Sequence, residues 1–284
     1  MMINGWFMYV GDFCVYIFFP LFLGAIFGSF LNVVIIRLPA HESVIFPRSH
    51  CPHCRKTIRF YDNIPILSFI FLRGECRYCS QKISFQYPLV ESITGLGFLC
   101  FFIHNNYQLD WMLWKNIVFF CCGLVIIFID LKHYIIPDVI SLPLIPLGII
   151  FSFLVEDTRF MPLIESAWKS SILGASIGFF LFWSLAYYYL RYKKKIGLGG
   201  GDIKYITAVG AFVYSEGLFF VLFFSSLLAL CFQGGQLFWK RKSINQEELA
   251  KLNILPFGVF ITIGAFLYIF FGEYLLNYYL SFWV

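Results

Sequence analysis

Long apolar stretches recur along the whole chain, and they constrain its fold more than any other feature. Hydrophobic residues make up 60% of the sequence and charged residues only 13%, whereas a typical soluble domain is about one quarter charged. So few charged groups cannot cover the surface of a water-soluble globule. The composition also excludes the disordered, collagen-like and disulfide-rich secreted classes. The sequence therefore predicts a protein that folds in a lipid bilayer.

Eight of the apolar stretches are candidates for crossing a bilayer, which takes a helix of about 20 residues. They show no alternation of polar and apolar residues, which favours helices over barrel strands, because a helix satisfies its own backbone hydrogen bonds in lipid. We expect an all-α polytopic membrane protein with about eight transmembrane helices. The predicted spans, of which the sixth is short, are 14–36, 88–104, 111–131, 135–155, 170–190, 203–214, 217–238 and 254–272.

Positive charge is distributed unevenly between the connecting loops. With eight spans, 18 of the 21 Lys and Arg residues fall on one side, in loops 37–87, 132–134, 191–204 and 239–253. Cytoplasmic loops carry such an excess, so we expect this side to be cytoplasmic and both termini to be periplasmic. The net charge of +5 then reflects topology and gives no reason to expect nucleic-acid binding, while basic loops favour anionic membrane lipid. Because residues 1–14 hold no Lys or Arg, we expect a retained anchor and no cleaved signal peptide.

Four of the nine cysteines lie in the loop 37–87, as two Cys-x-x-Cys pairs separated by 21 residues: Cys51, Cys54, Cys76 and Cys79. This spacing suits tetrahedral thiolate coordination of Zn²⁺ and is close to that of zinc ribbons. Disulfides are disfavoured in the cytoplasm, where the loop is expected to lie. Four protein ligands leave no position for water, so we expect a structural zinc in a small cytoplasmic loop domain. The alternatives are a redox pair or unconnected thiols.

Two aspartates lie beside apolar segments at the same expected membrane face. Asp130 ends the third predicted span and Asp202 begins the sixth. An ionisable group at membrane depth is costly and is therefore a candidate functional residue. Two carboxylates in one partly desolvated site do not both ionise easily, so one can activate water while the other donates a proton. This pattern indicates aspartic peptide hydrolysis, and the alternative for each residue is a helix cap or a partner for a nearby lysine.

A glycine run precedes the second aspartate, in Gly197-Leu198-Gly199-Gly200-Gly201-Asp202-Ile203-Lys204. Glycine lets a backbone approach closely, which would suit an extended substrate strand beside the two carboxylates. The run is not a phosphate-binding loop, because no Gly-Lys-Ser/Thr follows it. We therefore assign Gly199, Gly200, Gly201 and Lys204 to substrate binding. Glu91 is a further candidate, because it is an ionisable group beside an apolar segment,.

With these residues in place, the chain resembles the type IV prepilin peptidases over about residues 20–265. The motifs that carry the resemblance occur in the family's order: Gly28-Ser29-Phe30-Leu31-Asn32-Val33-Val34, Arg37-Leu38-Pro39, Asn63-Ile64-Pro65, Leu72-Arg73-Gly74, Tyr87-Pro88-Leu89-Val90-Glu91, Asp130, Ile136-Pro137-Asp138, Gly199 to Asp202 with Lys204, and Pro256-Phe257-Gly258. The four cysteines match the zinc-binding loop of the longer, bifunctional members.

The resemblance implies a bifunctional enzyme of the bacterial inner membrane. Such enzymes cut the basic leader from type IV prepilins and from the pseudopilins of type II secretion at the cytoplasmic face. They then methylate the new N-terminal residue, with S-adenosylmethionine as the methyl donor. By motif matching, Asp130 and Asp202 take the two catalytic positions. No Gly-x-Gly-x-x-Gly fingerprint is present, so the residues that bind S-adenosylmethionine are not assigned.

Together, these expectations divide the chain into an N-terminal transmembrane anchor (1–36), a cytoplasmic Cys₄ loop associated with methyl transfer (37–87) and a transmembrane aspartic peptidase core (88–284). Two other functions remain open at this point. One is a peptidase without methyltransferase activity. The other is a membrane transporter with an aspartate proton relay, which would more naturally lie near the middle of the membrane.

Overall fold

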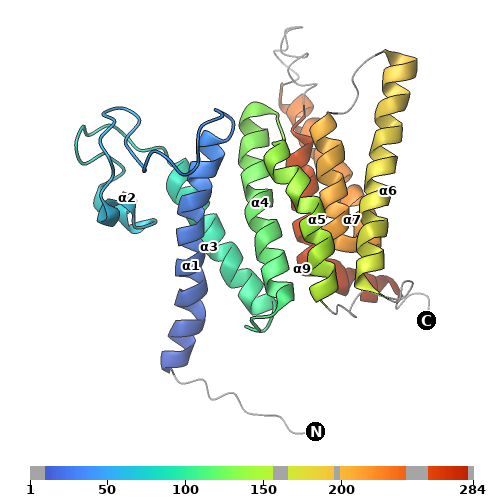
Figure 1. Ribbon diagram of the computed structural model, residues 1–284, viewed down its shortest axis with the longest axis horizontal. Helices are drawn as coiled ribbons and strands as arrows, with labels where there is room; N and C mark the ends of the chain where they lie inside the picture. The colour runs from blue at the N-terminus through green and yellow to red at the C-terminus, as the bar shows by residue number, and fades with distance from the viewer. Residues whose placement is uncertain (1–9, 156–165, 195–198, 241–254, 281–284) are drawn as a thin grey trace. The chain divides into compact units, whose positions relative to one another are not determined.

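The computed structural model describes residues 10–155, 166–194, 199–240 and 255–280. Within these ranges the chain is almost entirely helical, and extended pairing is limited to two isolated bridges, His50 with Thr57 and Glu75 with Lys82. The chain forms two compact units, residues 1–109 and residues 110–284, whose helices are labelled in Figure 1. Each unit is described by itself.

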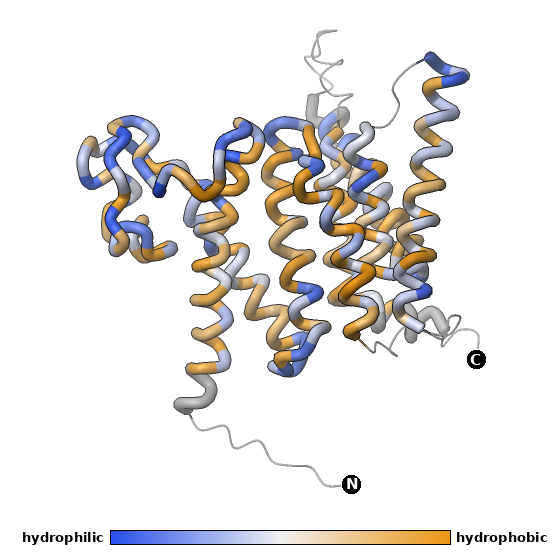
Figure 2. Tube along the Cα trace, in the orientation of Figure 1, coloured by the Kyte–Doolittle hydropathy of each residue, from blue (hydrophilic) through white to orange (hydrophobic). Residues whose placement is uncertain are grey.

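Within the described ranges, five helices are long and apolar enough to cross a membrane. They are α1 (Val10–Arg37), α3 (Gln86–His104), α4 (Trp111–His133), α6 (Ala167–Tyr188), which continues into the π-helical turn η2 (Tyr189–Lys193), and α7 (Gly200–Lys240). Apolar residues dominate these helices, and hydrophilic residues gather at their ends and along the loop after α1 (Figure 2). The prediction of an all-helical membrane protein is confirmed.

The predicted count of eight spans is not confirmed. The sixth and seventh predicted spans both lie in α7, on either side of a break at Tyr214 where two helices meet. The fourth and eighth correspond to shorter apolar stretches, in α5 (Asp138–Leu154) and in residues Phe257–Gly272 of α9 (Phe257–Leu280). Each predicted span therefore has a helical counterpart, although five helices in the described part of the chain meet the length and hydropathy expected of a full crossing.

In the first unit, α1 and α3 pack with their backbones in close contact. A Cβ atom placed on Gly24 would lie 2.6 Å from the carbonyl oxygen of Thr94, and one on Gly28 would lie 2.7 Å from the Cα of Glu91. Small residues four apart on one helix allow this approach, as is common between membrane helices. Asn32, fully buried, donates to the carbonyl oxygen of Tyr87 at 3.1 Å and ties the two helices further. The loop between them contains only two short helices, η1 (Phe60–Asn63) and α2 (Leu67–Phe71).

In the second unit, α7 is the central helix and packs against α5, α6 and α9. Its contact with α6 is again made by glycine, because a Cβ atom on Gly174 would lie 2.4 Å from the carbonyl oxygen of Gly210. The core is built largely on α7, from Tyr205, Ile206 and Leu218, together with Ile261 of α9. This arrangement fixes the start of α7 relative to α5 and α9.

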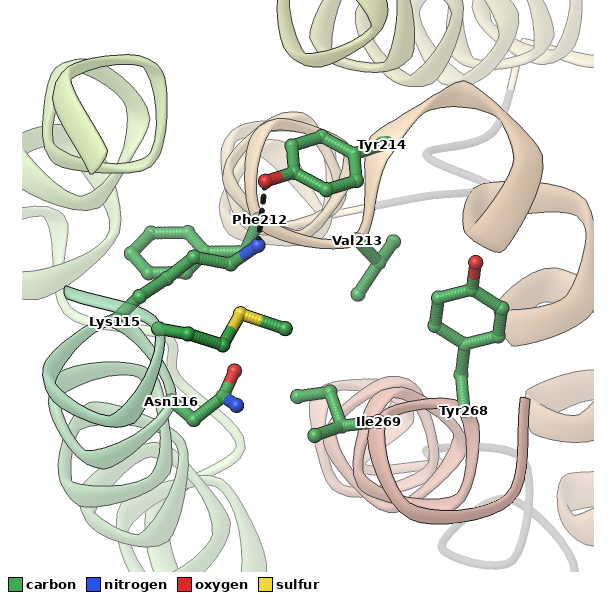
Figure 3. Close-up of a pocket in the computed structure, with 8 residues that line it drawn as sticks. Lys115, Asn116, Phe212, Val213, Tyr214, Tyr268 and Ile269 are labelled. Atoms are coloured by element: carbon green, nitrogen blue, oxygen red, sulfur yellow. Dashed lines mark hydrogen bonds between the residues drawn. The ribbon is translucent and has the colours of Figure 1, made fainter. Parts of the chain in front are cut away.

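The break in α7 lies at Tyr214, which has φ 66° and ψ 178°. Figure 3 shows the Tyr214 hydroxyl meeting the amino group of Lys115 from α4, and the two atoms are 2.8 Å apart. The Lys115 side chain is only 3% exposed. Beside it lies a small cavity of about 20 Å³, lined also by Asn116 and Tyr268. This volume is room for a single water. The contact offers a polar partner to a cation that would otherwise be buried at a cost.

Some predictions concern residues outside the described ranges. They include the positions of the two ends of the chain, most of the basic loop 239–253, and Gly197 and Leu198 of the glycine run.

Candidate functional site

Asp130 lies in the last turn of α4, where the chain leaves the helix and turns back into α5. Tyr134 ends α4 in a left-handed conformation (φ 55°), and its N–H donates to the carbonyl oxygen of Asp130 at 2.9 Å. Asp130 is buried, with 4% of its surface exposed. The connection then runs through Ile136 and Pro137, and Pro137 caps the start of α5.

Ile136 brings three distant segments to the same end of the second unit. A Cβ atom on Gly201, in the first turn of α7, would lie 3.1 Å from the Cβ of Ile136. One on Gly258, at the start of α9, would lie 2.8 Å from the Cδ1 of Ile136 and 2.9 Å from Oδ2 of Asp130. Only glycine fits at these two positions without displacing the neighbouring atoms. The segments that carry Asp130, Asp202 and the Pro256-Phe257-Gly258 motif therefore meet here.

Asp130 and Asp202 lie near enough for the charge of Asp202 to act on Asp130. The backbone N–H groups of Val259 and Gly258 approach the Asp130 carboxylate, and the N–H of Gly199 approaches that of Asp202. Oδ2 of Asp130 is buried and has no hydrogen-bond partner among the described residues. Two neighbouring carboxylates, one of them with an unpartnered oxygen atom, suit general acid–base hydrolysis.

Sequence reasoning did not identify the hydroxyl groups beneath this pair. Tyr205, one turn along α7 from Asp202, is fully buried and shares a 2.7 Å hydrogen bond with Thr262 of α9. Thr262 in turn donates to the carbonyl oxygen of Gly258 at 2.7 Å. Since Thr262 uses its proton there, the Tyr205 hydroxyl donates to Thr262. The signal available in the sequence was a hydroxyl residue four positions after Gly258 in an otherwise apolar stretch.

Lys204 and the three glycines have different surroundings. Lys204 donates to Oδ2 of Asp138 at 2.7 Å, and both side chains are partly exposed. The lysine therefore pairs with Asp138 and leaves the Asp202 carboxylate to other contacts. A Cβ atom on Gly199 would lie 3.1 Å from Oδ2 of Asp202, whereas one on Gly200 would meet nothing within 4 Å. Gly199 and Gly201 therefore lie close to neighbouring atoms, whereas Gly200 between them has open space beside it.

The four loop cysteines gather into one cluster in the first unit. Their Sγ atoms all lie within 4.8 Å of one another, and those of Cys51 and Cys79 are 3.8 Å apart. Tetrahedral zinc with Zn–S bonds of about 2.3 Å requires S···S separations of about 3.8 Å. The sequence pairs are therefore brought together with the spacing that a four-thiolate metal site needs.

The two halves of the cluster have the same local fold. In each, the N–H four residues after the first cysteine donates back to that cysteine's carbonyl oxygen, from Arg55 to Cys51 and from Ser80 to Cys76, at 2.9 Å in both cases. Arg55 and Ser80 are both left-handed, with φ of 56° and 53°. Such paired turns point the thiols of each Cys-x-x-Cys segment in one direction.

The thiol groups in the cluster differ in their proton affinity. The backbone N–H groups of Tyr78 and Cys79 lower the pKa of Cys76 to about 7. The N–H of Gln81 acts in the same sense on Cys79, but partial desolvation and the neighbouring thiol groups outweigh it and raise the pKa of Cys79 to about 11. Four thiolates therefore need a bound cation to be ionised together, which fits a metal site.

Glu91 lies on α3 in the first unit and is 6% exposed. Its Oε2 atom accepts a 2.7 Å hydrogen bond from the backbone N–H of Ile66, the residue that precedes α2. Ile66 has φ 61°, so the carboxylate supports a strained turn. The structure gives Glu91 a part in holding the loop to α3, and its role in substrate binding stays a prediction.

Each of the two units matches a known protein-family model. Residues 22–105 match the family model described as the bacterial peptidase A24 N-terminal domain. Residues 117–234 match the model of the type IV leader peptidase family. No solved structure matches the chain. The first match begins within α1 and covers the cysteine loop and α3, and the second begins in α4 and ends in α7, so it includes both aspartates.

Curated relatives are similar over most of their length. The chain is 31% identical to the "Prepilin leader peptidase/N-methyltransferase" of Xanthomonas campestris pv. campestris over 283 residues, 92% of this chain and 93% of that protein. It is 33% identical to the protein of that name from Bacillus subtilis, over 91% and 95% of the two chains. With the Neisseria gonorrhoeae protein of that name it shares 37% identity, over 73% and 78%.

The helical bundle, the buried carboxylate of Asp130 with that of the partly buried Asp202, and these similarities define a membrane-embedded peptidase. The chain belongs to the type IV leader peptidase family. The resemblance seen in the sequence is confirmed, and the family places the chain among peptidases and not among transporters.

Proposed function

We propose that this protein removes the leader peptide from type IV prepilins and pseudopilins and then methylates the new N-terminal residue. The observation that carries the proposal is the meeting of Asp130 and Asp202 at one end of the second unit, with an unpartnered carboxylate oxygen between tight glycine contacts. The names of the relatives support both activities.

Hydrolysis follows from the carboxylate pair. One aspartate takes a proton from a water molecule, whose oxygen bonds to the carbonyl carbon of the scissile peptide. The other donates a proton as the C–N bond breaks, so that the leader leaves with a carboxyl group and the pilin with a free amine. The N–H groups at the start of α9 hold Asp130 from one side, and Gly199 holds Asp202 from the other.

Substrate binding is proposed for the start of α7. Gly200 has open space where a side chain would be, so a substrate backbone can approach the helix there. Lys204, held by Asp138, lies within one turn of Asp202. A prepilin has a basic leader and an apolar helix, which places the scissile bond at a membrane surface. Glu91, in the first unit, is the acidic group proposed to dock the leader.

Methyl transfer is proposed for the first unit, where the cysteine cluster lies. Zinc fits the four thiols and would serve as a structural ion, because four protein ligands leave no open position. S-adenosylmethionine would supply the methyl group that the pilin amine accepts. The residues of the loop would orient the donor, and the cluster would keep their order in a segment too short for a core of its own.

We further propose that the enzyme lies in the bacterial inner membrane, with both termini periplasmic and the aspartates at the cytoplasmic face. The uneven distribution of Lys and Arg supports this orientation,.

The test is intact-mass spectrometry of a prepilin incubated with the purified enzyme and S-adenosylmethionine. We expect loss of the leader and gain of one methyl mass, and we expect Asp130→Asn and Asp202→Asn to leave the prepilin uncut. Asp138→Asn is the matched control, since it neutralises an exposed aspartate at the same end of the unit. Cleavage without methylation would support the alternative, a peptidase only. Cleavage by either aspartate variant at the wild-type rate would overturn the assignment of the pair.

A further inference from the structure

The cysteine loop carries a group of large apolar side chains on its outside. Four of them belong to η1 and α2, and together they form what we call the η1–α2 surface: Phe60, Leu67, Ile70 and Phe71. Phe60 is 85% exposed and Phe71 is 81% exposed. Side chains of this kind seldom lie together on a water-exposed loop unless they meet a partner. The metal cluster and the carboxylate pair do not use them.

The position of α2 relative to α3 indicates how deep the η1–α2 surface lies in the membrane. Ile66, which precedes α2, donates its N–H to Glu91 at 2.7 Å. Glu91 is the sixth residue of α3, so it lies about 7.5 Å along the helix axis from Gln86. Because α3 is a candidate membrane span that begins at Gln86, the start of α2 lies at the depth of the second turn of that span. Amphipathic segments at an interface lie about 5–10 Å into the boundary between headgroups and acyl chains.

The charge of the loop favours one kind of membrane surface. Residues 37–87 hold eight Lys and Arg against three Asp and Glu. Arg59 precedes η1 directly and Arg73 follows α2 by two residues, and both are exposed. Basic side chains beside an apolar surface attract anionic lipid headgroups, whereas the basic leader of a prepilin would be repelled by them.

We infer that the η1–α2 surface docks onto the membrane itself, with its apolar side chains in the headgroup region of an anionic phospholipid leaflet. The occupant is phospholipid, because α1 and α3 hold both ends of the loop at the membrane. Docking of this kind would hold the cysteine cluster close to the bilayer surface. The inference does not depend on either proposed enzymatic activity.

Photo-crosslinking of the full chain in nanodiscs tests this docking. A benzophenone amino acid replaces Phe71, and in the control it replaces His53, an exposed residue of the first cysteine pair. Mass spectrometry then identifies the adduct. We expect the yield of phospholipid adduct at position 71 to exceed that at position 53 by at least about tenfold. Burial of one Phe side chain can favour the docked over the undocked loop by that factor. Adducts to a second copy of the chain or to an added prepilin, or equal lipid yields at the two positions, would overturn the inference.

A second measurement does not require an unnatural amino acid. The rate of trypsin cleavage after Arg73 is compared in nanodiscs of phosphatidylcholine and in nanodiscs that contain phosphatidylglycerol. We expect slower cleavage in the anionic lipid, by roughly fivefold for each basic side chain at the surface. Phe71→Ser should remove the protection while the bound metal is retained. Equal rates in both lipids for the wild-type protein would overturn the role of lipid charge.

Discussion

The two units of the molecule assemble their candidate sites in different ways. The cysteine cluster of the first unit comes from two short turns with the same hydrogen bonds, each encoded within about six residues. The carboxylate pair of the second unit comes from the ends of α4 and α7, which are 72 positions apart in sequence, and is completed by the start of α9. The first site is locally encoded, and the second exists only when the helices pack.

This difference has a consequence for sensitivity to mutation. The metal cluster should tolerate changes in helix packing, because its turns are held by their own backbone and by the ion. The carboxylate pair should fail when a single contact between helices is disturbed, such as that of Gly258 with Asp130 and Ile136.

The largest expected effect is the difference in cleavage rate between Asp202→Asn and Asp138→Asn. Asp202→Asn should lower the rate of prepilin cleavage by about 10²- to 10⁴-fold, because it removes one partner of an acid–base pair. Asp138→Asn should lower it far less. Single-turnover cleavage assays measure both, and thermal unfolding verifies that the variants fold alike. Comparable losses for the two variants would show that charge at this end of the unit matters more than the pair.

Gly258→Ala tests the claim that packing builds the second site. The new methyl group would lie 2.9 Å from Oδ2 of Asp130, so cleavage should fall by about 10²-fold from misplacement of that carboxylate. Gly200→Ala is the matched control, because its methyl group meets nothing within 4 Å. If Gly200→Ala lowers kcat as much as Gly258→Ala does, backbone freedom and not packing would be the cause. A rise in KM alone for Gly200→Ala would instead support its place in substrate binding.

Removal of the metal tests the local encoding of the first site. The purified protein should hold about one zinc ion per chain, measured by elemental mass spectrometry, and Cys76→Ser should lose it. Without metal, the loop should become sensitive to trypsin while the helices of the second unit stay protected. Protein that is fully reduced, free of metal and still resistant in the loop would contradict a structural role for zinc.

Packing of α1 on α3 should affect the first unit alone. Gly24→Ala places a methyl group 2.6 Å from the carbonyl oxygen of Thr94, and overpacking of this kind costs about 1–3 kcal/mol of stability. Gly235→Ala is the control, since nothing lies within 4 Å of the added atom. Thermal unfolding in detergent measures both. We expect methyl transfer to fall in the first variant while cleavage is preserved.

The smallest effect is expected for the ion pair between Lys204 and Asp138. Both side chains are partly exposed, so Asp138→Asn should cost less than about 1 kcal/mol. Denaturant unfolding measures this change. A much larger loss would mean that the pair holds the start of α7 against α5.

Much of this arrangement could be predicted from the sequence, and the remainder shows where such reasoning ends. Hydropathy identified every long apolar helix among the described residues, and it placed separate spans on the two sides of the break at Tyr214 in α7. The cysteine spacing predicted a cluster because metal-ligand turns are local. The glycine run indicated close approach but not which glycine is tight, since that depends on Ile136 from the connection between α4 and α5. The hydrogen bond between Tyr205 and Thr262 joins α7 to α9, and no local pattern encodes it.

If the two units carry two separable activities, an assay of two variants on two substrates should separate them. Asp202→Asn and Cys76→Ser are each incubated with S-adenosylmethionine and either a prepilin or a pilin from which the leader has already been removed, and the products are weighed by intact-mass spectrometry. We expect Asp202→Asn to leave the prepilin whole but to methylate the cut pilin. We expect Cys76→Ser to cut the prepilin and to leave its amine without a methyl group. Loss of both activities in either variant, with the protein still folded, would contradict the claim.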